Sequence, residues 1–187
     1  MVWHARQRLE LGYYIFLLTL AIFFVAGMLA YAIIRINSPH LSYGAISLPL
    51  GFWISTLFLV GGSITLHIAV HEIRFERQQR FRQFLLASSF LGGGFAIIQT
   101  SLLWTLLADH YESLQVNIQM YGIVFTLVLL HALHFIAGLA VLFWVTFQGF
   151  RLRYDHEDFT SVRFCAIYWH FLDGVWLIML AVLYLVG

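Results

Sequence analysis

The chain contains little charge and no lysine. Of its 187 residues, 61% are hydrophobic and only 10% are charged, and all 10 basic residues are arginine. A soluble domain carries about 25% charged residues, so this composition excludes a soluble globular protein. With only two prolines and no low-complexity tract, the sequence also lacks a segment typical of a disordered linker. We therefore expect one domain, residues 1–187, that is integral to a membrane.

Two further absences exclude whole classes of function. The net charge is only +1, and no basic tract is present that could bind the phosphates of a nucleic acid. The single cysteine, Cys165, excludes an internal disulfide and every Cys-x-x-Cys metal or redox motif. No nucleic acid partner is expected, and no metal in this chain.

The sequence contains several long apolar runs. Five of them reach the roughly 20 residues that a membrane-spanning helix needs. They predict an all-α integral membrane bundle of five transmembrane helices, at about residues 11–35, 49–71, 84–108, 120–149 and 164–186.

The arginines predict the orientation of this bundle. Nine of the ten lie in the N-terminal segment, the 74–82 segment and the 151–163 segment, which an alternating topology places on one side. The two opposite loops contain only Arg35. Because cytoplasmic loops are enriched in arginine, we expect a cytoplasmic N-terminus and a periplasmic C-terminus.

Polar side chains within the spans are the candidate functional residues, because they are costly in hydrocarbon. Asp173 lies ten residues after Arg163, roughly 15 Å along the helix and near mid-membrane. Its carboxyl is therefore either protonated or paired, and His170, one turn away, is the nearest partner on the same helix. The expected buried polar residues with a structural role are His131, His134, His170 and Asp173.

Other interpretations of the histidines are metal or haem ligation and a proton relay. The pairs His131/His134 and His67/His71 each share a helix face, but neither pair has the several-turn separation that stacked bis-histidine haems require. A di-iron bundle site needs several carboxylates, whereas Asp173 is the one acid in mid-span. A relay needs protonatable groups in series across the membrane. Histidines that form hydrogen bonds within the bundle are the favoured interpretation.

Small residues at helical spacing predict close helix contacts, since helices in lipid associate by packing. Ser88, Gly92 and Ala96 form one such stripe, and Gly61 and Gly62 lie on the preceding span. The alternative, a ligand that approaches the backbone at 92–94, lacks the loop-to-helix context of a phosphate site.

The last predicted helix carries a specific motif. The sequence Tyr-Trp-His-Phe-Leu-Asp-Gly-Val-Trp at 168–176 resembles the last-helix signature of subunit III of the haem-copper terminal oxidases. Tyr121-Gly122, His131-Ala132-Leu133-His134 and Gly138 resemble the pattern of the family on the preceding helix, and Gly62-Ser63-Ile64-Thr65 resembles another segment. The resemblance covers nearly the whole chain, in the five-helix form of bacterial quinol oxidases.

The resemblance implies a non-catalytic subunit in the respiratory chain of a bacterial inner membrane. Such a subunit has no redox cofactor; the haems and copper are expected in partner subunits, with subunit I reducing oxygen and pumping protons. Subunit I is the expected main contact, alongside subunit II, other subunits and bound phospholipid. The main expectation is an oxidase that takes electrons from cytochrome c. The alternatives are a quinol oxidase subunit III and the related accessory protein of a nitric oxide reductase. An independent enzyme or transporter is the remaining rival.

Departures from the family pattern limit what the resemblance implies. Leu20 stands where family members often bury a glutamate in the first helix of this block, so no role of that acid is transferred. A supporting role in proton supply would then fall to lipid shielding or to the charged inner end, where charge can gather protons and anionic head groups. The candidate lipid-binding or proton-collecting residues there are His67, His71, Glu72, Arg74, Glu76, Arg77 and Arg80.

Overall fold

Five long helices make up the described part of the protein, which we analyse as a computed structural model covering residues 2–37, 50–111, 118–154 and 159–186. The helices are α1 (Val2–Asn37), α2 (Leu50–Arg74), α3 (Gln78–Tyr111), α4 (Ile118–Phe150) and α5 (Thr160–Val186). Each contains a stretch long and apolar enough to cross a membrane. The predicted all-α bundle of five spanning helices is therefore confirmed.

The helices are longer than the apolar runs from which they were predicted. α1 begins at Val2 rather than near residue 11, and α3 begins at Gln78 rather than near residue 84. Polar residues such as arginine and glutamine are good helix formers, so the helices continue past the apolar runs. The expected start of the second span at residue 49 lies outside the described residues.

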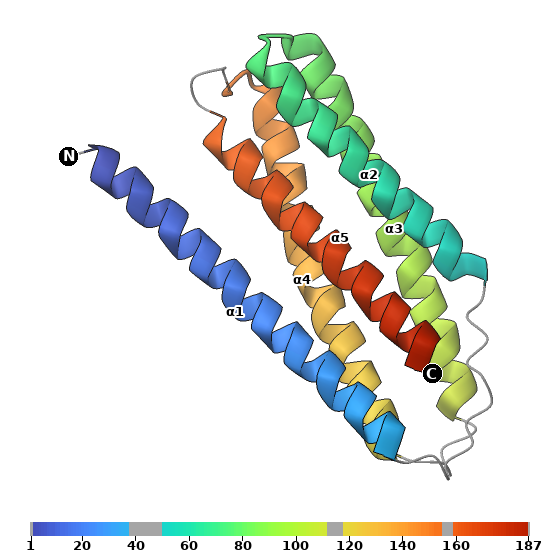
Figure 1. Cartoon of the computed structure of the whole chain (residues 1–187). Helices are drawn as coiled ribbons and strands as arrows, with labels where there is room; N and C mark the ends of the chain where they lie inside the picture. Colours follow the sequence, from blue (N-terminus) through green and yellow to red (C-terminus); the bar gives the residue numbers. More distant parts are fainter. Residues whose placement is uncertain (1, 38–49, 112–117, 155–158, 187) are drawn as a thin grey trace.

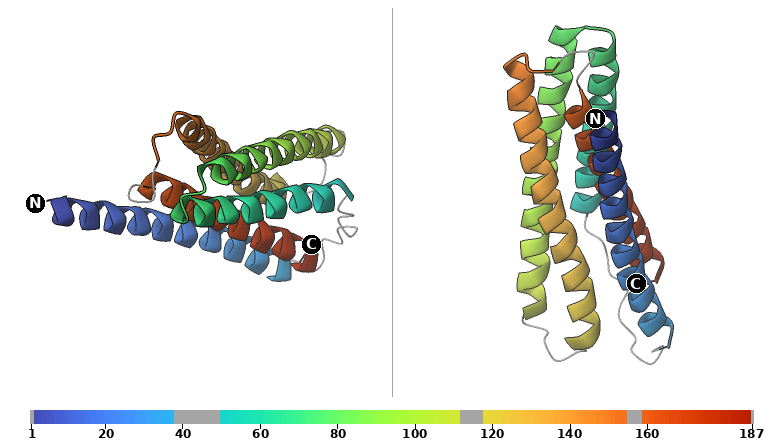
Figure 2. Two further views of the ribbon diagram at one scale, coloured as in Figure 1. Left: turned by 90° about the horizontal axis from the view of Figure 1, so that it is seen from above. Right: turned by 90° about the vertical axis from the view of Figure 1, so that its left-hand side faces the viewer.

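The helices form two layers. α5 lies between α1 and α2 in one layer, and α4 and α3 pack behind them (Figures 1 and 2). α2 and α3 form an antiparallel hairpin, while α1 packs against α4 and α5. α5 thus touches helices from both halves of the chain, which places its polar residues near the centre of the bundle.

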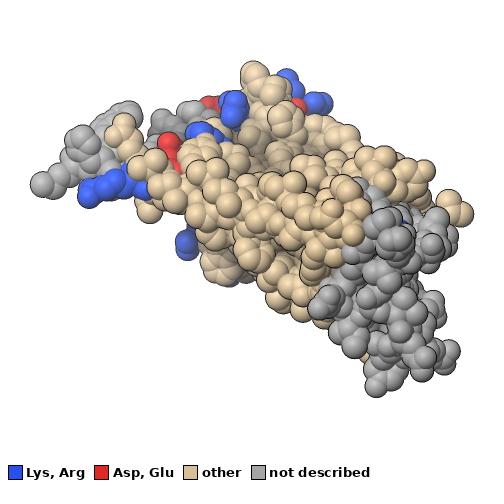
Figure 3. All heavy atoms as spheres, turned by 60° about the horizontal axis from the view of Figure 1, so that its bottom comes forward, with Lys and Arg blue, Asp and Glu red and all other residues tan. Residues whose placement is uncertain are grey.

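The alternating helix directions bring the start of α1, the α2–α3 turn, the end of α4 and the start of α5 to one end of the bundle (Figure 1). Arginine atoms gather toward one end of the molecule, and the middle of the surface carries no blue or red atoms on the face in Figure 3. Large apolar side chains within the helices are exposed, such as Ile22, Leu57 and Phe90. An exposed apolar band of this kind is expected of a protein whose solvent is lipid.

Two helix C-termini at this end adopt the same hydrogen-bonded cap. After α2, the Arg77 amide donates to the Glu72 carbonyl and the Glu76 amide donates to the Ile73 carbonyl. After α4, Arg153 and Leu152 donate in the same pattern to Gln148 and Gly149. The pattern places Glu76 and Leu152 in the left-handed region, at φ 59° and 56°, where glycine is usual.

Small residues and large aromatic rings together close the core. Gly92 of α3 faces the buried indole of Trp169, which reaches across from α5. Gly62 of α2 packs on the α3 backbone, and Ser89 of α3 bonds to Thr146 of α4 over 2.9 Å. The predicted helix-contact role of the small residues is confirmed at Gly62 and Gly92. No described atom lies within 4 Å of a side chain added at Gly93.

Candidate functional site

Four polar side chains from α2 and α5 meet within the bundle, and we call them the α2–α5 cluster: Ser63, His67, His170 and Asp173. The Ser63 Oγ lies 2.6 Å from His170 Nδ1, in a hydrogen bond whose donor depends on the imidazole tautomer. The ring centroids of His67 and His170 are 6.0 Å apart. Ser63 and His67 lie one turn apart on α2, as His170 and Asp173 do on α5, so the two helices present facing pairs.

Asp173 is the innermost member of the cluster. The residue is 6% exposed, and neither carboxyl oxygen has a hydrogen-bond partner among the described residues. The Ser63 hydroxyl bonds to His170, which lies one turn before Asp173 on α5, and this places Ser63 on the side of α5 that carries the carboxyl. Of the two possibilities, a protonated or a paired carboxyl, the described residues show no direct bond between Asp173 and His170, whose ring bonds to Ser63 of α2.

His131 is buried among aromatic rings on α4. Its ring stacks against Trp176 at a centroid distance of 5.5 Å and meets the Phe24 ring edge-on at 6.2 Å. Neither of its nitrogens has a hydrogen-bond partner in the part of the chain that the structure describes. His134, one turn on, is half-buried, and its Nδ1 lies 2.7 Å from the Leu130 carbonyl oxygen. His131 thus packs as an apolar ring, while His134 bonds to its own helix.

The remaining candidate residues lie near the arginine-bearing end. His67, His71, Arg74, Glu76, Arg77 and Arg80 are exposed. Glu72 differs from them: it is buried, and its Oε2 lies 3.6 Å from the Arg77 guanidinium. Glu72 is therefore covered by the α2–α3 turn, and only its partner Arg77 is open to a lipid head group or to water.

The possible metal ligands in the described helices are not gathered into a metal site. In the described ranges, no group of three or more histidine, cysteine, aspartate or glutamate residues is placed to hold a metal ion. His131 and His134 make separate contacts, and His67 and His71 are exposed on α2. The cluster chemistry that the structure offers is thus the sharing of protons among imidazole, hydroxyl and carboxyl groups.

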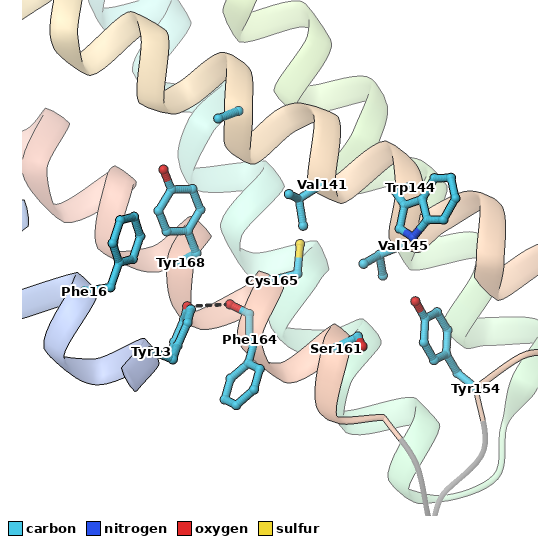
Figure 4. Close-up of a pocket in the computed structure, with 11 residues that line it drawn as sticks. Tyr13, Phe16, Val141, Trp144, Val145, Tyr154, Ser161, Phe164, Cys165 and Tyr168 are labelled. Carbon is cyan, nitrogen blue, oxygen red and sulfur yellow. Dashed lines mark hydrogen bonds between the residues drawn. The ribbon is translucent and has the colours of Figure 1, made fainter. Parts of the chain in front are cut away.

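A pocket of about 490 Å³ opens between α1, α4 and α5 (Figure 4). The Tyr13 hydroxyl donates to the Phe164 carbonyl over 2.7 Å at its edge, and the two rings stack at 4.5 Å. Its lining is predominantly apolar and aromatic: Tyr13, Phe16, Ala137, Val141, Trp144, Val145, Tyr154, Ser161, Phe164, Cys165 and Tyr168. The pocket offers a shape and lining suited to a hydrocarbon chain.

Two contributors to these sites were missed by sequence reasoning. Ser63 stands out in the sequence only within the segment Gly62-Ser63-Ile64-Thr65, but it is the hydrogen-bond partner of His170. The one-turn spacing of Ser63 and His67 indicates a shared face of α2, but the sequence does not give the helix that this face meets. Tyr13 lies in the apolar run of the first span, and no sequence signal links it to Phe164.

Comparison with known proteins gives relatives over most of the chain. No protein-family profile matches the sequence. The chain is 25% identical over 177 residues to cytochrome bo(3) ubiquinol oxidase subunit 3 of Buchnera aphidicola, covering 94% of this chain and 85% of that protein. It is 27% identical over 185 residues to the Pseudomonas putida protein of that name, covering 97% and 87%. Cytochrome c oxidase subunit 3 of Mus musculus is 26% identical over 133 residues, or 70% of this chain and 48% of that one. The resemblance drawn from the motifs is therefore confirmed.

Proposed function

We propose that this homologue of haem-copper oxidase subunit III is the third subunit of a proton-pumping terminal oxidase in an aerobic respiratory chain. In this role it packs against subunit I, contacts subunit II and carries no redox cofactor, while partner subunits hold the haems and copper. The observation that carries the proposal is the similarity to subunit 3 proteins over 94–97% of the chain. The five apolar helices and the lack of a metal cluster in the described ranges are consistent with it.

The electron donor would be determined by a partner subunit and not by residues of this chain. Relatives come from both ubiquinol and cytochrome c oxidases, and the donor site of either enzyme would lie on another subunit. The chain matches the ubiquinol oxidase relatives over 85–93% of their length. It matches the mouse cytochrome c oxidase subunit over 48%. The similarity supports a quinol oxidase and a cytochrome c oxidase equally.

Affinity purification tests the proposal. A tagged chain extracted in mild detergent should copurify with a large haem-bearing subunit, and the haem spectrum of the eluate identifies the complex. A copper-containing soluble domain on the second subunit would indicate cytochrome c as donor, and its absence would indicate quinol. Elution of this chain without haem-bearing partners, from membranes that respire normally, would contradict the proposal. Non-haem iron in the active subunit would instead identify a nitric oxide reductase.

The arginine-bearing end is proposed to face the cytoplasm of a bacterial cell. Arg74, Arg77, Arg80, Arg151 and Arg153 are exposed at this end, and the positive-inside rule favours the cytoplasmic side for them. Alkaline phosphatase fused after Gly187 should then be active, and a fusion in the α2–α3 turn should be inactive. The reverse result would overturn the orientation.

The pocket between α1, α4 and α5 is proposed to hold a phospholipid acyl chain. Its apolar lining suits hydrocarbon, and Arg163, which donates to the Tyr14 hydroxyl over 3.4 Å, lies next to Phe164 of the lining. An arginine there could bind the lipid phosphate. Native mass spectrometry should find phospholipid retained by the wild-type protein and reduced by Val141→Trp. Equal retention in both would place the lipid elsewhere.

A further inference from the structure

We propose that the α2–α5 cluster stores a proton on Asp173. The proton exchanges with the exposed surface of α2 through Ser63, His170 and His67. This inference goes beyond the proposed function and does not depend on it, since all four groups belong to this chain. It rests on three observations: the buried Asp173 carboxyl without a hydrogen-bond partner in the described ranges, the short Ser63–His170 bond, and the exposed His67 imidazole beside His170.

The four groups form a series in depth. His67 lies seven residues before the end of α2 at Arg74, about 10 Å along the helix, and Asp173 lies 13 residues after the start of α5 at Thr160, about 20 Å. The series therefore runs from near the arginine-bearing end toward the membrane interior. His67, the member of the series nearest the arginine-bearing end, is exposed, and Asp173, the deepest member, is buried.

The series ends at Asp173. The next polar contacts toward the opposite end are the Trp176 indole, which donates to Thr56 Oγ1, and Ser55, which donates to Gln99 Oε1. Indole, hydroxyl and amide groups do not change protonation in the physiological range. The cluster is thus a reservoir with one opening rather than a path across the membrane.

The proton transfer balances within the cluster. The Asp173 O–H bond breaks as its proton passes to Ser63 Oγ, and the original Ser63 hydroxyl proton passes to His170 Nδ1. The products are the Asp173 carboxylate and a His170 imidazolium, which then releases its Nε2 proton toward His67 or water. Re-uptake reverses each step. Serine serves both as acceptor and donor, as a bridging hydroxyl must.

Other titratable groups lie around α5 without joining the series. On α4, His131 stacks on Trp176 and His134 bonds to the Leu130 carbonyl. On α1, the Tyr13 hydroxyl donates to the Phe164 carbonyl. On α2, the buried Glu72 pairs with Arg77 at the bundle end. His134, Tyr13 and Glu72 thus have other polar partners, and His131 is packed among aromatic rings.

Infrared spectroscopy of the purified protein, in lipid and with whatever subunits copurify, tests the proposal. We expect a protonated carboxyl band that Asp173→Asn removes and that shifts on transfer to heavy water. Ser63→Ala and His67→Phe should each slow this hydrogen–deuterium exchange several-fold. His71→Phe, one turn further toward the end of the same helix, is the matched control and should leave the exchange rate unchanged.

Three results would overturn the proposal. The first is an Asp173 carboxyl that is ionised from mildly acidic to mildly alkaline pH. The second is an exchange rate in Ser63→Ala and His67→Phe equal to that of the wild type. The third is a slowing of the exchange by His71→Phe that equals the slowing by His67→Phe.

If Asp173→Asn fails to fold, a hydrophobic carbodiimide assigns the band in the wild-type protein. It adds to a protonated carboxyl in apolar surroundings, the acid proton moving to a carbodiimide nitrogen, and peptide mass spectrometry then locates the adduct. An unlabelled Asp173 under these conditions would also refute the proposal.

Discussion

Replacing Gly92 with alanine should destabilise the bundle, whereas the same change at Gly93 should not. A Cβ at position 92 would lie 2.6 Å from Cη2 and 2.9 Å from Cζ2 of Trp169, and 3.2 Å from Leu139 Cδ1. Trp169 is 1% exposed, so its rigid ring has no free space into which to move. At position 93, no described atom lies within 4 Å of the added carbon.

The two variants separate packing from helix propensity. Each gains about 1 kcal/mol because alanine is the better helix former, and only Gly92→Ala incurs the roughly 1–3 kcal/mol typical of overpacking a core. The difference between the two variants is therefore about 1–3 kcal/mol in unfolding free energy. At about 2–4 °C per kcal/mol for a chain of this size, Gly92→Ala should melt several degrees below Gly93→Ala.

Thermal unfolding in detergent, followed by near-ultraviolet circular dichroism at one scan rate, measures this difference. Trp169→Phe combined with Gly92→Ala should recover part of the loss, because the smaller ring vacates the space that the methyl group enters. This double-mutant cycle reports coupling between α3 and α5 directly. Equal melting temperatures for Gly92→Ala and Gly93→Ala, or strictly additive effects in the cycle, would refute the contact.

Three further predictions follow from other contacts. Asp173→Leu should lower the amount of the chain recovered with its partner subunits and leave the haem spectrum of the remaining core unchanged; normal recovery would show that the acid is dispensable for assembly. Leu152→Gly should raise the unfolding free energy by about 1 kcal/mol, because it relieves the positive φ; Leu152→Ala keeps the strain and should not. Tyr13→Phe removes the bond to the Phe164 carbonyl, and thermal unfolding should show a loss of about 1 kcal/mol. Tyr14→Phe is the comparison: it removes only the long, exposed contact with Arg163, so its loss should be smaller.

The number and type of helices could be predicted because each apolar run is long enough to cross a bilayer on its own. Which face of each helix meets which neighbour could not be predicted. A helix that is apolar on all sides gives no direction for its packing, so neither the Trp169–Gly92 contact nor the Ser63–His170 bond follows from the sequence. Local spacing did indicate that Gly62 and Gly92 would lie at helix contacts.

The burial and the partners of the candidate residues could likewise be predicted only in part from the sequence. Burial of Asp173 followed from its place in an apolar run, but its partner did not, because residues one turn apart on a helix can be directed at different neighbours. The sequence groups Glu72 with the candidate lipid-binding or proton-collecting residues of the charged inner end, because it adjoins arginines. Its burial depends on the α2–α3 turn, in which the Arg77 amide bonds to the Glu72 carbonyl and the guanidinium approaches the carboxylate.

The position of α1 has a consequence for how the protein is made. α2 and α3 are consecutive and pair directly, with Thr65 and Ser88 hydroxyls 3.1 Å apart, so this hairpin can enter the bilayer as a closed unit. α1 is synthesised first, yet its contacts are with α4 and α5, and the Tyr13–Phe164 bond joins residues 151 positions apart. Among the described helices, α1 therefore has no partner until α4 is inserted, and its contacts are complete only after α5 follows. Assembly of the bundle is complete only when the final helix is inserted between α1 and α2.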